Sequence, residues 1–272
     1  MKKHLVTFLD FYLKSSIHVA LAVVSLAYIS FGINGVKPSI ELLIFIFCSA
    51  VFAYNFVKYF PFKTSKKQIT LSPFILGVSV LALALCGYFV FYLKPLSILL
   101  VLLGCALVLL YSIPLHHDKK NFRNKKGWKI YLVVFSWLIL TVALPFIEIF
   151  TFNFTLFFYC LLVQGIYLFV AILPFDIRDL NEDSMSLQTF PQKWGIKKVK
   201  IVGVFLLFVI SLFVLFTFQT STSFVISALL SFVLLAIFLI RSTPHRSIYY
   251  TAFWVEGIPM IWLGSFHLFD YF

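Results

Sequence analysis

The sequence predicts an all-α, polytopic membrane protein with nine transmembrane helices in a single domain, residues 1–272. Two observations predict this class. Hydrophobic residues make up 62% of the chain and charged residues only 12%, whereas soluble domains contain about 25% charged residues. In addition, no polar stretch is long enough to form a soluble domain. A water-soluble fold, a disordered chain and a disulfide scaffold are therefore excluded.

Residues 1–14 differ from the apolar runs that follow them. They alternate Lys, His and Asp with Leu, Val and Phe, a pattern typical of an amphipathic helix lying at the membrane surface. A membrane-spanning helix needs about 20 mostly apolar residues. The runs that meet this requirement are 16–35, 39–60, 71–93, 95–114, 129–150, 153–175, 199–218, 222–241 and 248–270. Lys94-Pro95 is the tightest turn between two spans, because Pro cannot continue the preceding helix.

The basic residues predict the orientation of these spans. An odd number of spans places the termini on opposite sides, and 20 of the 22 Lys and Arg residues then share the side of the N-terminus. Only Lys37 and Lys94 fall on the other side. Basic loops remain in the cytoplasm, so we expect a cytoplasmic N-terminus and an external C-terminus in a bacterial inner (plasma) membrane. The net charge of +12 thus reflects topology and membrane lipid, and no nucleic-acid partner is expected.

Four of the ten acidic residues lie within positions 176–183, where the sixth span leaves the membrane. Asp176, Asp179 and Asp183 are spaced three and four apart, so a continuous helix would present them on one face. Three carboxylates on one face repel each other unless a cation lies among them. Mg²⁺ is such a cation, since it prefers carboxylate and phosphate oxygens. The spacing therefore predicts a Mg²⁺ site, and the alternative is a solvated acidic loop.

The residues from 176 to 195 resemble the second aspartate-rich motif of the UbiA superfamily of intramembrane prenyltransferases. Asp176, Asp179 and Asp183 stand at its three aspartates, and the following Thr, Pro and Gly are matched by Thr189, Pro191 and Gly195. The resemblance implies a UbiA-like bundle. It also implies Mg²⁺-assisted transfer of a prenyl group from a polyprenyl diphosphate to a hydrophobic acceptor, such as an aromatic compound or quinone precursor.

A second match is the segment YSIPLHHDKK at 111–120, which resembles the YSxP segment and basic loop after the fourth span of that family. Tyr111, Ser112 and Pro114 match it residue by residue. The resemblance makes Lys119 or Lys120 the candidate for the basic contact to the diphosphate.

The first aspartate motif of the family, NxxxDxxxD, is altered in this chain. Asn55 is retained, but Tyr59 and Lys63 occupy the two aspartate positions. On one interpretation, Lys58 and Lys63 bind the diphosphate and one Mg²⁺ suffices instead of two. On the other, Lys58 or Lys63 pairs with the remaining aspartates. The chain is then a catalytically inactive UbiA-like protein that binds isoprenoid lipids or a partner protein.

On the catalytic interpretation, Asp176, Asp179 and Asp183 hold Mg²⁺, and with Lys58 and Lys63 they stabilise the departing diphosphate. Tyr59 or Tyr111 flanks the allylic cation with its ring. The candidate substrate contacts are Asn55, Tyr59, Lys119, Lys120, Arg178, Lys193 and Glu256. Glu256 is an ionisable group two turns into the last span, where it contacts an acceptor headgroup or satisfies backbone groups freed by Pro259.

Overall fold

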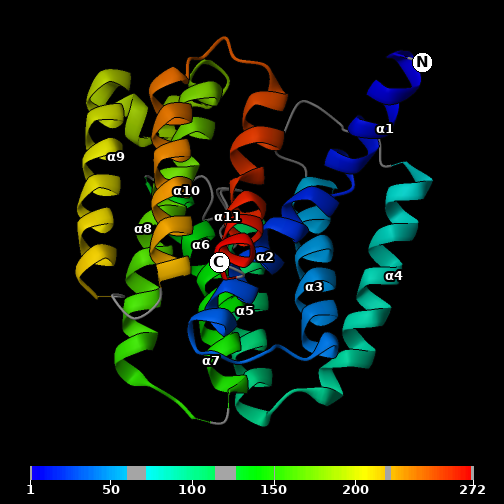
Figure 1. Ribbon diagram of the computed structural model, residues 1–272. Coiled ribbons are helices and arrows are strands. Elements are labelled where there is room, and N and C mark those ends of the chain that lie inside the picture. Colours follow the sequence, from blue (N-terminus) through cyan, green and yellow to red (C-terminus); the bar gives the residue numbers. More distant parts are fainter. Residues whose placement is uncertain (1, 60–71, 114–126, 150, 218–221, 271–272) are drawn as a thin grey trace.

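The computed structural model describes residues 2–59, 72–113, 127–149, 151–217 and 222–270 (Figure 1). Every regular element within these ranges is helical. In the described part of the chain, seven helices are long and apolar enough to cross a membrane, and eight if α1 and α2, which meet at a bend of 58°, form one broken span. The prediction of an all-helical, multi-pass membrane protein is therefore confirmed, whereas a ninth span is not shown.

The elements follow the apolar runs because a helix satisfies all its own backbone hydrogen bonds, as lipid requires. The α-helices are α1 Lys2–Lys14, α2 Ile17–Ile33, α3 Ile40–Tyr59, α4 Pro73–Phe89, α5 Pro95–Ser112, α6 Trp128–Leu138, α7 Leu144–Glu148, α8 Phe154–Arg178, α9 Phe190–Thr217, α10 Thr222–Arg241 and α11 Glu256–Asp270. The 3-10 segments are η1 Val90–Tyr92, η4 Asp179–Asn181 and η5 Met185–Leu187, and the π-helical segments are η3 Ile139–Ala143 and η6 Tyr250–Val255.

The bundle has two packed groups that share α2. Figure 1 shows α9 and α10 on one side, α3 and α4 on the other, and α2 with α11 between them. One core joins α2 to α6, α8, α9, α10 and α11 around the fully buried Tyr167, Phe232 and Trp262. The other joins α2 to α3, α4, α5 and α7. Among these helices, α3 carries Asn55, Lys58 and Tyr59, α8 carries Asp176 and Arg178, and α11 carries Glu256.

The helices α4 and α5 contribute little to either core. Within them only Ile75, Ala82 and Ser97 are buried, and long apolar side chains such as Phe74 and Leu99 are exposed. In water such surfaces would be costly, but lipid tails are as apolar as Leu. The exposed faces of α4 and α5 are therefore suited to contact with lipid.

Two regions depart from the expected spans. The run 248–270 is helical throughout, but residues 250–255 form the π-helical η6 before the helix continues as α11, because the Pro259 ring cannot accept a regular α-helical turn before it and the π-turn absorbs the misfit. This helix is not one of the seven counted above. The run 199–218 begins earlier than expected, since α9 starts at Phe190 and breaks at Gly195 (φ 77°, ψ 155°).

The conformation of Gly195 supports a prediction about stability. An L-residue with a side chain is strained in this extended conformation of positive φ, so we expect Gly195→Ala to lower the free energy of unfolding by about 1–3 kcal/mol. A Cβ atom at Gly195 would meet nothing within 4 Å, so any loss reports backbone conformation alone. Denaturation of the protein in bicelles measures the effect. The control is Gly77→Ala in α4, equally open but helical, which should lose nothing.

At the end of the bundle away from residues 176–183, Lys94 and Glu148 cap each other's helices. Lys94 Nζ donates to the carbonyl oxygens of Ile147, Glu148 and Ile149 at 2.9, 3.0 and 3.2 Å. Glu148 Oε1 accepts from the Lys94 backbone N–H at 3.0 Å and from Ser97 Oγ. Each charge thus lies at the helix end of opposite partial charge, which fixes α5 against α7.

Candidate functional site

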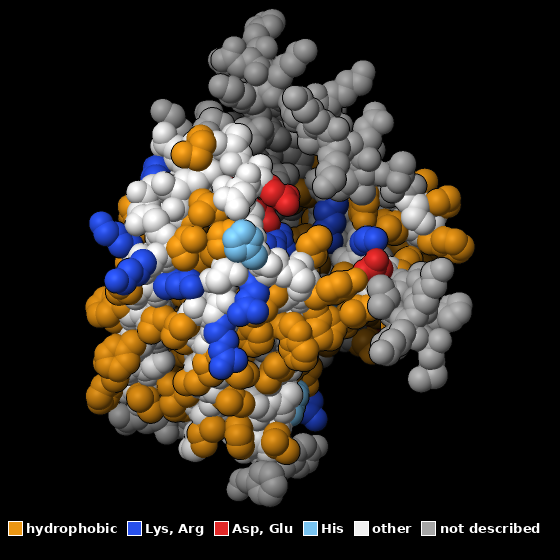
Figure 2. Space-filling view, turned by 90° about the horizontal axis from the view of Figure 1, so that it is seen from above, with side chains coloured by type: hydrophobic (Ala, Val, Ile, Leu, Met, Phe, Trp, Pro, Cys, Tyr) orange, Lys and Arg blue, Asp and Glu red, His pale blue; other side chains and the backbone are white. Residues whose placement is uncertain are grey.

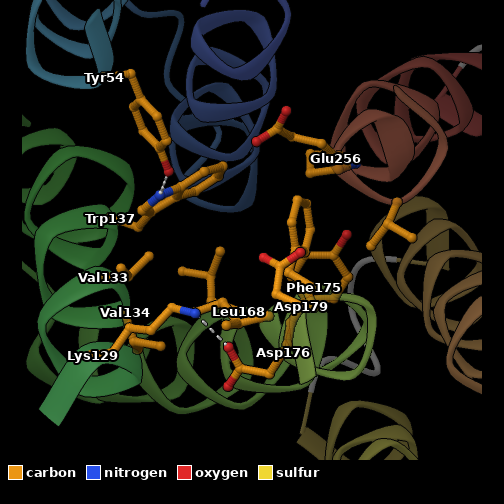
Figure 3. A pocket seen from close by; sticks show the side chains of 15 residues that line it. Tyr54, Lys129, Val133, Val134, Trp137, Leu168, Phe175, Asp176, Asp179 and Glu256 are labelled. Carbon is orange, nitrogen blue, oxygen red and sulfur yellow. Dashed lines mark hydrogen bonds and ion pairs between the residues drawn. The ribbon is translucent and has the colours of Figure 1, made fainter. Parts of the chain in front are cut away.

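A cavity of about 210 Å³ lies between α3, α6, α8 and α11. Its walls are mostly apolar and aromatic, with charged groups contributed by Lys129, Asp176, Asp179 and Glu256 (Figure 3). The remaining lining residues are Tyr54, Val133, Val134, Trp137, Tyr167, Leu168, Ala171, Ile172, Phe175, Val255 and Pro259. An apolar pocket with a few converging polar groups is the usual form of a ligand site.

Lys129 bridges two of the predicted aspartates at the rim of this cavity. Its Nζ lies 2.9 Å from Asp176 Oδ1 and 3.1 Å from Asp183 Oδ2. Lys129 is in the first turn of α6 and Asp176 is in the last turn of α8, and these two helices are in contact. The side chain of Asp176 is only 3% exposed. The ammonium group therefore neutralises carboxylates that would be costly to leave buried and unpaired.

Asp179 is held separately by Arg178. The guanidinium of Arg178 contacts both carboxylate oxygens of Asp179, with Nε–Oδ1 at 2.6 Å and Nη2–Oδ2 at 3.0 Å, and it also donates to Thr251 Oγ1. The α-helix ends at Arg178, so Asp179 begins η4 and Asp183 follows it in a turn. The expectation that one continuous helix carries all three aspartates on one face is therefore wrong.

These ion pairs determine whether the three aspartates can bind Mg²⁺ in the arrangement that the structure gives them. Among the described residues, no group of three or more His, Cys, Asp or Glu side chains is placed to hold a metal ion. Lys129 occupies the position between Asp176 and Asp183 that a cation would take, and Arg178 forms a two-point ion pair with Asp179. The donor set does not fit Mg²⁺ in this arrangement, because both cation positions belong to the protein's own side chains.

The segment that replaces the first aspartate motif lies against the end of α1. Asn55 is buried, accepts from Ser16 Oγ at 2.8 Å, and donates to the Ser15 carbonyl oxygen and Ser79 Oγ at 3.1 and 2.9 Å. Lys58 Nζ donates to the Leu13 carbonyl oxygen and Ser16 Oγ at 3.2 and 2.9 Å. Tyr59 Oη donates to the carbonyl oxygen of Lys14 at 2.9 Å. These side chains thus cap α1 and join it to α2, α3 and α4.

The other predicted residues are dispersed. Tyr111 is half-buried near the end of α5, and Lys193 is exposed in the first turn of α9. Glu256 lines the cavity wall across from Asp179 (Figure 3). Lys63, Lys119 and Lys120 lie outside the described residues. Of the predicted residues, the structure thus brings Asp176, Arg178, Asp179, Asp183 and Glu256 to the cavity or its rim.

Sequence reasoning missed Lys129, which it counted only among the basic residues of a loop. A signal was present, since Lys129 directly precedes an apolar span and the acidic cluster ends the next span. Consecutive antiparallel helices bring the start of one beside the end of the other. The first turn of the span at 129 and the last turn of the span ending near 176 are therefore expected neighbours, and opposite charges there form a pair.

The rim lies at the end of the bundle where several helices finish with a basic residue, including Lys58 of α3, Arg178 of α8 and Arg241 of α10. Figure 2 shows this end, with Lys and Arg side chains spread over it and acidic side chains in their midst. No protein-family model, characterised protein or solved structure significantly matches the chain.

Proposed function

We propose that this chain is a UbiA-like membrane protein that binds an isoprenoid or similarly apolar lipid without transferring it. One observation carries the proposal. The carboxylates that would hold a catalytic metal ion are already neutralised by Lys129 and Arg178 at the rim of an apolar cavity.

The size of the cavity supports binding of one end of such a lipid. Pockets that enclose a drug-sized ligand measure about 300–1,000 Å³, and this cavity measures about 210 Å³. It therefore encloses a head-sized group or the first part of a chain, not a whole polyprenyl tail. The remaining tail would follow the apolar outer surface of the helices into the surrounding lipid.

The charge of the site argues against a free diphosphate head. Four carboxylates, from Asp176, Asp179, Asp183 and Glu256, lie at the cavity or its rim, and within the described part of the chain only Lys129 and Arg178 form ion pairs with any of them. Electrostatic repulsion from this surplus disfavours an anion. An uncharged or positively charged head is accepted more readily.

Filling the cavity tests this proposal. Ala171 lines it, so Ala171→Phe should abolish equilibrium binding of radiolabelled geranylgeraniol to the protein in nanodiscs. The matched control is Ala84→Phe on the exposed face of α4, which should bind as the wild type does. Equal binding by both variants would show that the lipid occupies another surface.

Prenyl transfer is the second candidate, and the match of residues 176–195 to the family motif favours it. Because Lys129 and Arg178 fill the cation positions, we expect Mg²⁺ neither to raise the melting temperature of the wild-type protein nor to support diphosphate release from prenyl diphosphates of several chain lengths. Release that requires Mg²⁺ and is lost in Asp179→Ala would instead establish the transferase.

The proposal includes a bacterial inner membrane location with a cytoplasmic N-terminus, an external C-terminus and η6 with α11 as the ninth span. The basic last turns of α1, α3, α8 and α10 support it through the preference of basic residues for the cytoplasmic side. Accessibility of single cysteines introduced at Lys37 and Lys197 to an impermeant thiol reagent tests the orientation, since only the former should react from outside.

A further inference from the structure

We infer that the cavity binds an organic ammonium group, held by the carboxylate of Glu256 within a set of aromatic side chains. This inference rests on the proposed lipid-binding function and names the head group that the site accepts. Two independent features of the cavity lead to it, an unpaired acid and an aromatic lining.

Glu256 is the acid without a partner. It lines the cavity, yet no hydrogen bond or ion pair joins its carboxylate to any residue that the structure describes. Lys58 and Arg178 act on Glu256 electrostatically, but their hydrogen bonds are directed elsewhere, because Lys58 donates to Leu13 and Ser16, and Arg178 donates to Asp179 and Thr251. A buried carboxylate that no side chain contacts directly is costly to keep ionised, and a cation bound beside it removes that cost.

Four aromatic side chains line the same cavity: Tyr54, Trp137, Tyr167 and Phe175. Trp137 Nε1 donates to Tyr54 Oη at 2.6 Å, and these two rings are perpendicular with centroids 6.3 Å apart. This bond fixes both rings at the wall facing Glu256 (Figure 3). The ring of Phe175 already contacts a cation, since the guanidinium carbon of Arg178 lies 5.5 Å from its centroid.

Aromatic rings that line a cavity together with a carboxylate form a chemical environment that recognises quaternary ammonium groups, because ring faces attract a cation that can make few hydrogen bonds. The same environment discriminates against anions through the charge of Glu256 and against neutral polar groups, which gain less from the ring faces. The cavity volume of about 210 Å³ suits a head group of this kind. Its source is either a free small cation or the head of a tailed amine.

The test is equilibrium binding of radiolabelled choline to the full chain in phosphatidylglycerol nanodiscs, whose lipids contain no ammonium group. Dimethylbutanol, in which carbon replaces the choline nitrogen, is the neutral competitor. We expect it to compete at least about tenfold more weakly than choline, and Glu256→Gln to weaken choline binding about tenfold. The matched control is Glu41→Gln in the first turn of α3, outside the cavity, which should leave binding unchanged.

Geranylgeranylamine and geranylgeraniol distinguish the two sources of the ammonium group. Stronger displacement of choline by the tailed amine than by the alcohol identifies a lipid head. Displacement by free cations alone keeps the ammonium site but contradicts the proposed lipid function. Equal binding of amine and alcohol, with no effect of Glu256→Gln, overturns the ammonium site and leaves lipid binding intact. If Glu256→Gln does not fold, Trp137→Leu replaces it, because loss of the ring should likewise weaken amine binding and spare the alcohol.

Discussion

Lys129→Met is expected to lower the free energy of unfolding by about 3–5 kcal/mol, the range for removing one partner of a buried ion pair. The substitution keeps the length of the side chain but leaves Asp176 and Asp183 without the ammonium that lies 2.9 and 3.1 Å from them. Denaturation of the purified protein in bicelles measures the loss. Lys197→Met, on an exposed position of α9, is the control and should change stability by less than about 0.5 kcal/mol.

A rescue experiment separates charge from packing at the same site. Adding Asp176→Asn and Asp183→Asn to Lys129→Met removes the uncompensated charges, so most of the lost stability should return. If Lys129→Met alone is as stable as the wild type, the bridge does not hold the rim together. That result would also contradict the conclusion that Lys129 neutralises Asp176 and Asp183.

Asn55→Leu is expected to lower the free energy of unfolding by about 2–3 kcal/mol. Each of the three hydrogen bonds of Asn55 contributes about 1 kcal/mol, and their loss leaves buried polar partners unsatisfied. The control is Asn34→Leu at the end of α2, where the amide donates a single hydrogen bond to the Ser30 carbonyl oxygen, so a smaller loss is expected. The same bicelle denaturation compares the two variants.

This comparison also decides what Asn55 does. A structural role predicts lost stability with unchanged affinity for geranylgeraniol in the protein that remains folded. The opposite outcome, unchanged stability with lost ligand binding, would assign Asn55 to the substrate as the family resemblance implies.

Most of the helices could be predicted from the sequence because apolar length alone determines where a chain can cross lipid. The runs 39–60 and 222–241, for example, correspond to α3 and α10 within a few residues. The change from the π-helical η6 to α11 could not be predicted in the same way. Hydrophobicity does not distinguish an α-turn from a π-turn, and Pro259 gives the position of a disturbance without its form.

Only part of the candidate site could be predicted from the sequence. The clustering of acidic residues predicted Asp176 and Asp179, which line the cavity. The position of Glu256 two turns into the last span predicted that residue. The end of α8 at Arg178 could not be inferred from acid spacing, since the spacing is equally compatible with a longer helix. The role of Lys129 depends on a contact with a residue 47 positions away, and the aromatic lining collects side chains from three helices that no local pattern connects.

Lys94 and Glu148 are 54 residues apart in the chain. On the proposed topology, Lys94 lies in the external turn between η1 and α5, and it is synthesised before the segment that carries its partner Glu148. The α4–α5 hairpin packs first against α3, which precedes it in the chain. The Lys94–Glu148 caps that join α5 to α7 form only after α7 has been synthesised, so this half of the protein is completed in the order of translation.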